Sequence, residues 1–173
     1  MRMRTAAAVP LLTAGLLAGC WSSPEPPEQT FVGLRLSEGA PEFWPGRTCE
    51  GVSAIEVEVE TPQAEPQSWT ATAEDGTGTV ETVHLGEPPA GFTSTDPAPT
   101  WAQDAEVTVA VLGEEGLPYS RSTWSLAEVA TAKGRTADGQ WLTTLDRWVG
   151  EDDVEDLADE GIYPVLCGDP ASS

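Results

Sequence analysis

The chain has 173 residues and carries 29 acidic side chains against 8 basic ones, which gives a formal net charge of −21. This balance excludes nucleic acid as a partner, because phosphate binding requires clustered lysine and arginine, and it favours cationic partners. The length suits one ordinary domain behind a short leader, and such a domain is large enough to bury a core.

The first twenty residues have the organisation of an export signal. Arg2 and Arg4 form a positive head, and the apolar residues 5–18 that follow are fewer than the about 20 of a membrane-spanning helix. A charged head, a short apolar middle and small residues at the end are typical of a secretory signal peptide, here residues 1–19. Removing it would bring the net charge from −21 to −23.

The signal ends in Leu17-Ala18-Gly19-Cys20, which closely resembles the lipobox of bacterial lipoproteins. In that family the signal is cut directly before the cysteine, whose sulfur carries a diacylglyceryl group. The resemblance implies that a lipidated Cys20 holds the protein at the extracytoplasmic face of the cell membrane, since two acyl chains anchor stably. The alternative is an ordinary signal peptide that is cut elsewhere. Arginine in excess of lysine, with much alanine, glycine and proline, is typical of a high-GC Gram-positive bacterium.

Residues 20–30 are predicted to be a tether. They contain the stretch SSPEPPEQT, which has three prolines and no aliphatic side chain that could join a core. A proline-rich segment tends toward an extended conformation of roughly 3.1 Å per residue, so the tether would lift a domain on the order of 25–30 Å from the bilayer. Residues 31–173 are then a single extracytoplasmic domain.

Two cysteines remain in that domain, Cys49 and Cys167. An exported protein meets an oxidising setting, so this pair predicts a disulfide, with two free thiols as the alternative. Metal binding is disfavoured because neither cysteine has another cysteine or histidine at zinc-site spacing. The bond would close a loop of roughly 100 residues or more, for which a chain-entropy model gives about 4.7 kcal/mol.

The domain begins with strand patterns. Ile55, Val57 and Val59 alternate with glutamates, and this period of two indicates a strand with one buried face. Residues 40–46 suggest a turn, and Glu74-Asp75-Gly76 predicts a hairpin between two of the strands. These features predict a mainly β, antiparallel sandwich. The expected strands are residues 31–36, 52–60, 69–73, 79–85, 106–112 and 120–124.

The last third predicts one or two short helices. Ser125-Leu126-Ala127-Glu128 fits a capping box and starts a helix, with a strand through Val129 and a turn at Asp138-Gly139 as the alternative. Residues 141–149 fit a helical face but form only a short segment. Residues 151–160 predict a small amphipathic helix that ends at Gly161. Residues 163–167 are typical of a final edge strand.

The order Cys49, Trp69, Cys167 loosely resembles that of immunoglobulin domains, although Cys167 comes much later than the family's second cysteine. The resemblance implies a sandwich and nothing finer. Trp69 and Trp124 lie on predicted strands and are expected in the core. Trp44 and Trp101 lie in predicted loops and are the candidate ligand surface, for instance for a glycan.

No cofactor motif is present, and calcium is the one ion for which candidate ligands occur. Residues 151–160 hold seven acids in ten positions, but they fail the pattern of an EF-hand loop. A non-standard calcium site in this segment is therefore the remaining alternative. Its ligands would be Asp152, Asp153, Asp156 and Glu160.

The sequence favours a binding role over catalysis. His84 is the only histidine and has no serine-nucleophile motif near it, and no phosphate-binding loop occurs. Glu56, Glu58 and Glu60 share one strand face, which is typical of a solvated sheet surface and, alternatively, of paired catalytic acids. The leading hypothesis is a non-enzymatic interaction module that binds an envelope protein or cell-wall component. A carboxylate-based envelope hydrolase and a glycan- or calcium-binding accessory domain are the alternatives.

Overall fold

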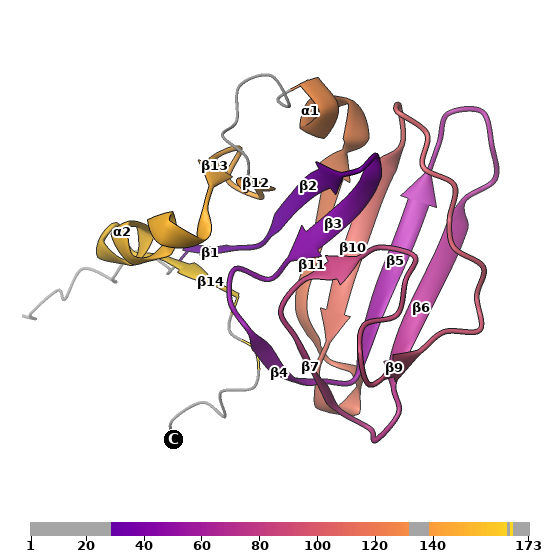
Figure 1. Cartoon of the computed structure of the whole chain (residues 1–173), viewed down its shortest axis with the longest axis horizontal. Helices are drawn as coiled ribbons and strands as arrows, with labels where there is room; N and C mark the ends of the chain where they lie inside the picture. Colours follow the sequence, from indigo (N-terminus) through magenta and orange to yellow (C-terminus); the bar gives the residue numbers. More distant parts are fainter. Residues whose placement is uncertain (1–28, 132–138, 166, 168–173) are drawn as a thin grey trace, which may run out of the picture.

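The computed structural model describes residues 29–131, 139–165 and 167. The protein is mainly β, with 47% of its residues in strands and 14% in helices, and its antiparallel sheets and two short helices form the predicted class of sandwich. Figure 1 shows α2, β1 and β14 at the left end of the molecule and the long strands β5 and β6 at the right. None of the helices in the described part is long and apolar enough to cross a bilayer.

The first sheet has five antiparallel strands in the order β11-β10-β5-β6-β9. Its strands follow the predicted alternation: Ile55, Val57 and Val59 are at most 1% exposed, while the glutamates between them are exposed. One face of this sheet therefore lies on the core and the other faces solvent. The strands are β5 (Ala54–Glu60), β6 (Gln67–Ala73), β9 (Phe92–Thr93), β10 (Glu106–Leu112) and β11 (Pro118–Ser125), with the short 3-10 helix η1 (Glu114–Gly116) before β11.

The second sheet has the order β13-β12-β2-β3-β8. The prediction of a turn over residues 40–46 is wrong, because this segment contains β3, and the turn lies earlier, at Glu38 and Gly39. Both of these residues have positive φ, as a tight type I′ hairpin turn requires. The strands are β2 (Gly33–Ser37), β3 (Ala40–Trp44), β8 (Val83–His84), β12 (Trp141–Thr143) and β13 (Trp148–Val149).

Two small ladders complete the β structure. β1 (Gln29–Phe31) pairs in parallel with β14 (Ile162–Pro164), so a strand at the start of the domain lies beside one near its end. β4 (Cys49–Val52) pairs with β7 (Gly78–Val80). The predicted hairpin around Asp75-Gly76 is therefore wrong: the chain turns there, but β7 leaves β6 and joins β4, where Val80 is buried in the core.

The helices confirm two predictions and correct one. α1 (Leu126–Thr131) begins directly after the expected cap residue Ser125, so the alternative strand through Val129 does not form; Asp138 lies outside the described residues. η3 (Glu151–Asp153) and α2 (Val154–Asp159) cover the predicted amphipathic helix, which ends at Gly161 with φ +79°. Residues 141–149, which fit a helical face, instead form the β12–β13 hairpin.

The core has two parts. The larger cluster lies between the two five-stranded sheets and includes Trp69 and Trp124, as predicted. The smaller cluster lies on the other face of the second sheet, because side chains alternate across a strand and Phe43 belongs to the larger cluster while Trp44 belongs to the smaller one. The smaller cluster contains Phe31, Trp44, Trp141, Val149 and Leu157.

The predicted disulfide is formed between Cys49 and Cys167, whose Cα atoms are 5.0 Å apart. It ties β4 to the segment after β14, so it joins chain regions 118 residues apart. This differs from the immunoglobulin arrangement, in which the bond connects the two main sheets beside the conserved tryptophan.

Candidate functional site

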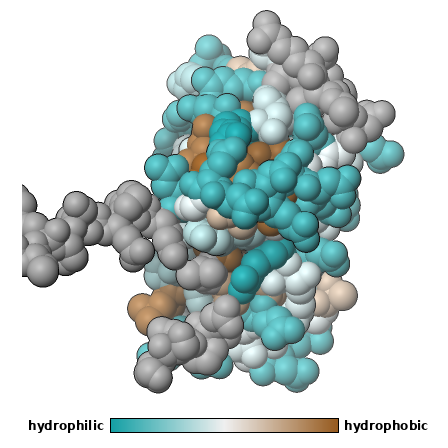
Figure 2. Space-filling model, turned by 90° about the vertical axis from the view of Figure 1, so that its left-hand side faces the viewer, coloured by the Kyte–Doolittle hydropathy of each residue, from teal (hydrophilic) through white to brown (hydrophobic). Residues whose placement is uncertain are grey.

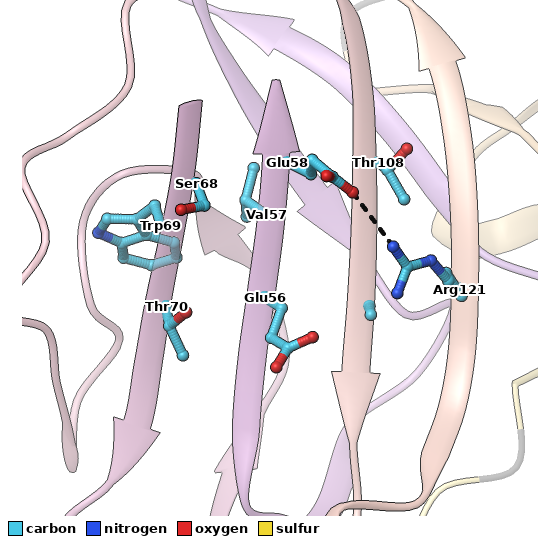
Figure 3. A pocket seen from close by; sticks show the side chains of 9 residues that line it. Glu56, Val57, Glu58, Ser68, Trp69, Thr70, Thr108 and Arg121 are labelled. Carbon is cyan, nitrogen blue, oxygen red and sulfur yellow. Dashed lines mark hydrogen bonds and ion pairs between the residues drawn. The ribbon is translucent and has the colours of Figure 1, made fainter. Parts of the chain in front are cut away.

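A hollow of about 260 Å³ opens on the solvent face of the first sheet (Figure 3). Strand register explains where it lies: Ala110 on β10 stands between Glu56 on β5 and Arg121 on β11. Alanine carries only a methyl group, whereas both of its neighbours are long, so space remains above Ala110 and the flanking side chains form walls. The lining residues are Glu56, Val57, Glu58, Ser68, Trp69, Thr70, Thr108, Ala110 and Arg121.

The walls of the hollow are polar. Thr70 and Ser68 on β6 stand beside Glu56 and Glu58, and Thr108 lies next to Glu58 on the other side. The hydroxyls of Thr108 and Thr123 are 2.8 Å apart and share a hydrogen bond across β10 and β11. The hollow therefore offers hydroxyl groups and carboxylates on a rigid sheet rather than on loops.

One ion pair crosses the hollow. The Arg121 guanidinium donates from Nη2 to Glu58 Oε2 at 3.2 Å, and the two side chains are 60% and 47% exposed. An ion pair this exposed contributes only about 0–1 kcal/mol, so a competing cation can displace Arg121 at little cost. The Glu56 carboxylate has no hydrogen-bond or ion-pair partner within the described residues, and Figure 3 shows it pointing away from the Glu58–Arg121 pair.

A second polar row crosses the outer face of the second sheet. Arg35, Glu42 and His84 lie in register on β2, β3 and β8. Glu42 is 5% exposed and takes a hydrogen bond from Arg35 Nε at 2.6 Å, while His84 Nε2 lies 3.5 Å from its other oxygen. The Arg35 guanidinium also lies 3.9 Å above the Trp141 ring. The row compensates a buried carboxylate, so it stabilises the sheet. His84, whose side chain is 57% exposed, lies at a sheet surface as expected.

The candidate tryptophan surface is not formed. Trp44 is 3% exposed and stacks on Trp141 at 5.5 Å between ring centroids, so the prediction that it lies in an exposed loop is wrong. In the sequence, Pro41 and Pro45 favour a turn around Trp44. In the structure, Trp44 ends strand β3, and the outer face of β3 is covered there. Trp101 is partly buried against the larger cluster, whereas Trp44 belongs to the smaller one, so the two tryptophans do not form one surface.

The structure does not bring the candidate calcium ligands together in the described residues. In the described ranges no group of three or more histidine, cysteine or acidic side chains is placed to hold a metal. Asp153 Oδ2 accepts a hydrogen bond from the Gly150 amide at 2.7 Å, and Glu160 pairs with Arg147 at 2.8 Å. The hydrogen bond and charge of Arg147 lower the pKa of Glu160. Asp152 and Asp156 are exposed on η3 and α2, and no three of the four proposed ligands are grouped to hold a metal in the described part of the chain.

Sequence reasoning found part of the hollow. It placed Glu56 and Glu58 on one exposed face, which the structure confirms. It missed Arg121 and Ala110, because β10 and β11 reach these glutamates only through long-range pairing. The available signal was weak: Arg121 is a rare basic residue within the small polar stretch Ser120–Thr123. Cys20 lies outside the described residues.

Comparisons with models of protein families, with curated proteins and with solved structures find no match to this chain.

Proposed function

We propose that the chain is a lipid-anchored lipoprotein at the extracytoplasmic face of a bacterial membrane, and that its sandwich is a non-enzymatic binding module. The observation that carries the binding role is the hollow, which sets the unpartnered Glu56 carboxylate beside an exposed, weakly held Glu58–Arg121 pair. The resemblance of Leu17-Ala18-Gly19-Cys20 to a lipobox supports the anchor. The partner is an envelope protein or a cell-wall component.

The hollow suits a ligand that presents an ammonium or guanidinium group. Such a group entering above Ala110 contacts the Glu56 carboxylate. It can also pair with the Glu58 carboxylate after Arg121 has left its ion pair with Glu58. Hydroxyls of Ser68, Thr70 and Thr108 supply neutral hydrogen bonds around it. The net charge of −21 raises the local concentration of cationic ligands and speeds their association at low salt.

The chain entry point supports a hollow that faces away from the membrane. β1 begins at Gln29, whose amide donates to the carbonyl of Gly161 beside α2. In Figure 1 these elements lie at the left end, and β5 and β6 lie at the right. A tether that ends at β1 would therefore leave the sheet carrying Glu56 and Glu58 open to the outside.

Binding to the hollow is tested with a fluorescently labelled short peptide that carries one lysine side chain. Fluorescence anisotropy of the full chain is expected to show about tenfold weaker binding for Glu56→Gln, which corresponds to roughly 1.4 kcal/mol. Arg121→Ser is expected to bind more tightly, since it removes the internal competitor. Glu60→Gln is the matched control, because Glu60 lies on the same face of β5 and outside the hollow. Equal weakening by Glu56→Gln and Glu60→Gln would contradict the proposal.

The anchor is tested separately in cells. Replacing Cys20 with alanine is expected to release the protein from the membrane fraction and to abolish incorporation of radiolabelled palmitate. Cys49→Ala is the control, since that cysteine belongs to the disulfide and its loss should leave labelling intact. A Cys20→Ala variant that stays in the membrane fraction would rule out the lipid anchor.

A carboxylate hydrolase is the second candidate, because Glu56 and Glu58 line the same hollow. The Cα atoms of residues two apart on an antiparallel strand are about 6.8 Å apart, so both glutamates leave the same face of β5 at neighbouring positions. Inverting glycosidases hold their two carboxyl groups about 6.5–9.5 Å apart. Release of reducing sugar from purified cell-wall glycan would support this candidate if Glu56→Gln and Glu58→Gln each abolish it. Unchanged release in both variants would leave the binding role alone.

A further inference from the structure

A second surface lies at the α2 end of the molecule, on the far side of the second sheet from the larger core. Leu145, Val154 and Ile162 pack against the smaller cluster and stay partly exposed. They come from the β12–β13 turn, from α2 and from β14. Figure 2 looks at this end and shows an apolar hollow enclosed by hydrophilic residues. We name Leu145, Val154 and Ile162 the apolar patch.

The surroundings of the apolar patch are strongly acidic. Seven of the ten residues 151–160 are acids, and all but Asp153 are exposed. Arg147, in the β12–β13 turn, already forms an ion pair with Glu160, with 2.8 Å between Nη1 and Oε2. Five of the seven acids lie in η3 and the first turn of α2, where negative charge is favourable. Asp159 and Glu160 lie at the carboxyl end of the helix, where negative charge is unfavourable, so the helix gains nothing from the macrodipole at these two positions.

We infer that the apolar patch and its acidic rim are a docking surface for a basic amphipathic segment of a partner protein. Such a segment places an apolar side chain on the apolar patch and lysine or arginine against the acidic rim, so it complements both parts of the surface. A second copy of this chain is disfavoured, because it would bring the same acidic rim. A bilayer is disfavoured because anionic head groups are repelled by α2.

This inference is independent of the hollow on the first sheet. It concerns the other end of the molecule, beside the start of β1, where Gln29 bonds to Gly161. For a chain held by a tether that precedes β1, the docking surface would face partners that are themselves close to the membrane. The segment that binds is defined by its chemistry: one apolar face and one basic face.

The test uses a labelled synthetic peptide with leucine on one helical face and lysine on the other, titrated against the full chain. The double variant Glu155→Gln/Asp156→Asn is expected to weaken binding on the order of tenfold. Its matched control is Glu114→Gln/Glu115→Gln, which removes the same charge from the exposed β10–β11 turn. Equal weakening by both double variants would show attraction to overall charge and would overturn the inference.

The apolar contribution is tested with Val154→Ser, which is expected to weaken binding about fivefold to tenfold by loss of buried area. Leu117→Ser is the control, since Leu117 is 64% exposed on a different part of the surface. Circular dichroism must show both variants folded; if Val154→Ser is not, Leu145→Ser replaces it. A peptide in which serine replaces every leucine should bind weakly, and equal binding of the two peptides would overturn the inference.

Two further measurements separate the other occupants. Analytical ultracentrifugation of the full chain would reveal a dimer that Val154→Ser dissolves, and such a dimer would show that a second copy covers the apolar patch. Co-sedimentation of the Cys20→Ala chain with zwitterionic lipid vesicles would show a membrane occupant if Val154→Ser prevents it. Either result would replace the proposed protein partner, and a monomer that ignores vesicles would support it.

Discussion

The first sheet and the α2 end of the molecule differ in how they bury their side chains. Along β5, buried and exposed residues alternate without exception from Ile55 to Glu60. Along β3, by contrast, Pro41, Glu42, Phe43 and Trp44 are all buried, and all three residues of β12 are buried too. The first sheet has one solvated face, whereas the second sheet is covered by the larger core on one side and by the smaller cluster on part of the other, where His84 on β8 stays exposed.

This difference teaches where binding surfaces can form. A sheet with a free face leaves its outward side chains available, and here they build the hollow around Ala110. A sheet that is largely covered on both faces has few exposed side chains, and most of the exposed groups lie on the elements that cover it. The acidic rim and the apolar patch accordingly belong to α2 and its neighbours.

The largest expected loss of unfolding free energy comes from removing a large side chain from the larger core. Trp69→Ala is expected to cost about 3–5 kcal/mol of unfolding free energy, because the side chain is 1% exposed and packs between two rigid sheets. Trp141→Ala, equally buried in the smaller cluster, should cost less, about 2–3 kcal/mol, since partly exposed neighbours can close over the gap. Urea unfolding followed by circular dichroism measures both. A larger loss for Trp141→Ala would break the proposed difference between the two clusters.

Both disulfide cysteines lie in the larger core cluster, and Cys167 follows β14 of the α2 end, so removing the bond tests how strongly that end depends on the larger core. Cys49→Ala/Cys167→Ala is expected to lose about 2–5 kcal/mol, mainly by freeing a loop with ends 118 residues apart in the unfolded chain. Thermal melts of this variant and of the native chain provide the measurement. Identical midpoints, with free-thiol assays confirming the native bond, would show that the regions hold together without it.

The same contrast explains what the sequence could predict. The sequence predicts β5 and β10 almost to the residue, because a buried β-branched residue at every second position (Ile55, Val57 and Val59; Val107, Val109 and Val111) marks a strand with one core face. β12 was ambiguous, because Trp141-Leu142-Thr143 is buried on both faces and has no period of two. Hydrophobic residues alternate with polar ones only where a strand has one buried and one exposed face. A strand that is buried on both faces therefore gives no such pattern in the sequence.

The candidate sites could be predicted from the sequence only in part, because their residues come together through pairing of distant strands. Glu56 and Glu58 could be placed on a common face from the sequence, but Arg121 and Ala110 could not, since only long-range pairing brings them together. Trp44 was assigned to a surface because Pro41 and Pro45 resemble turn residues. The small parallel β1–β14 ladder, which helps to cover that tryptophan, joins the two ends of the domain and leaves no local signal.

A smaller effect distinguishes two buried tryptophans by their indole N–H groups. Trp124 Nε1 donates to the Leu142 carbonyl at 3.2 Å, whereas Trp141 Nε1 is buried with no partner among the described residues. Trp124→Phe should therefore cost about 1 kcal/mol more than Trp141→Phe, since only the first change removes a buried hydrogen bond. The two replacements remove the same atoms, so each controls for the other. Equal losses in urea unfolding would show that the hydrogen bond contributes nothing net.

The smallest effect concerns the ion pair that links the β12–β13 turn to the end of α2. Arg147 lowers the pKa of Glu160, first through a hydrogen bond and then through its charge, so this pair stabilises the fold above the ordinary glutamate pKa of 4.5. The stabilisation is lost as pH falls through the lowered pKa of the folded state. Thermal midpoints of the native chain and Glu160→Gln should therefore differ slightly at pH 7 and converge toward pH 3. Glu155→Gln, which removes an exposed carboxylate from the same helix, should not show that convergence. A Glu160→Gln difference that is constant with pH would show that the α2 end is held by its small apolar cluster alone.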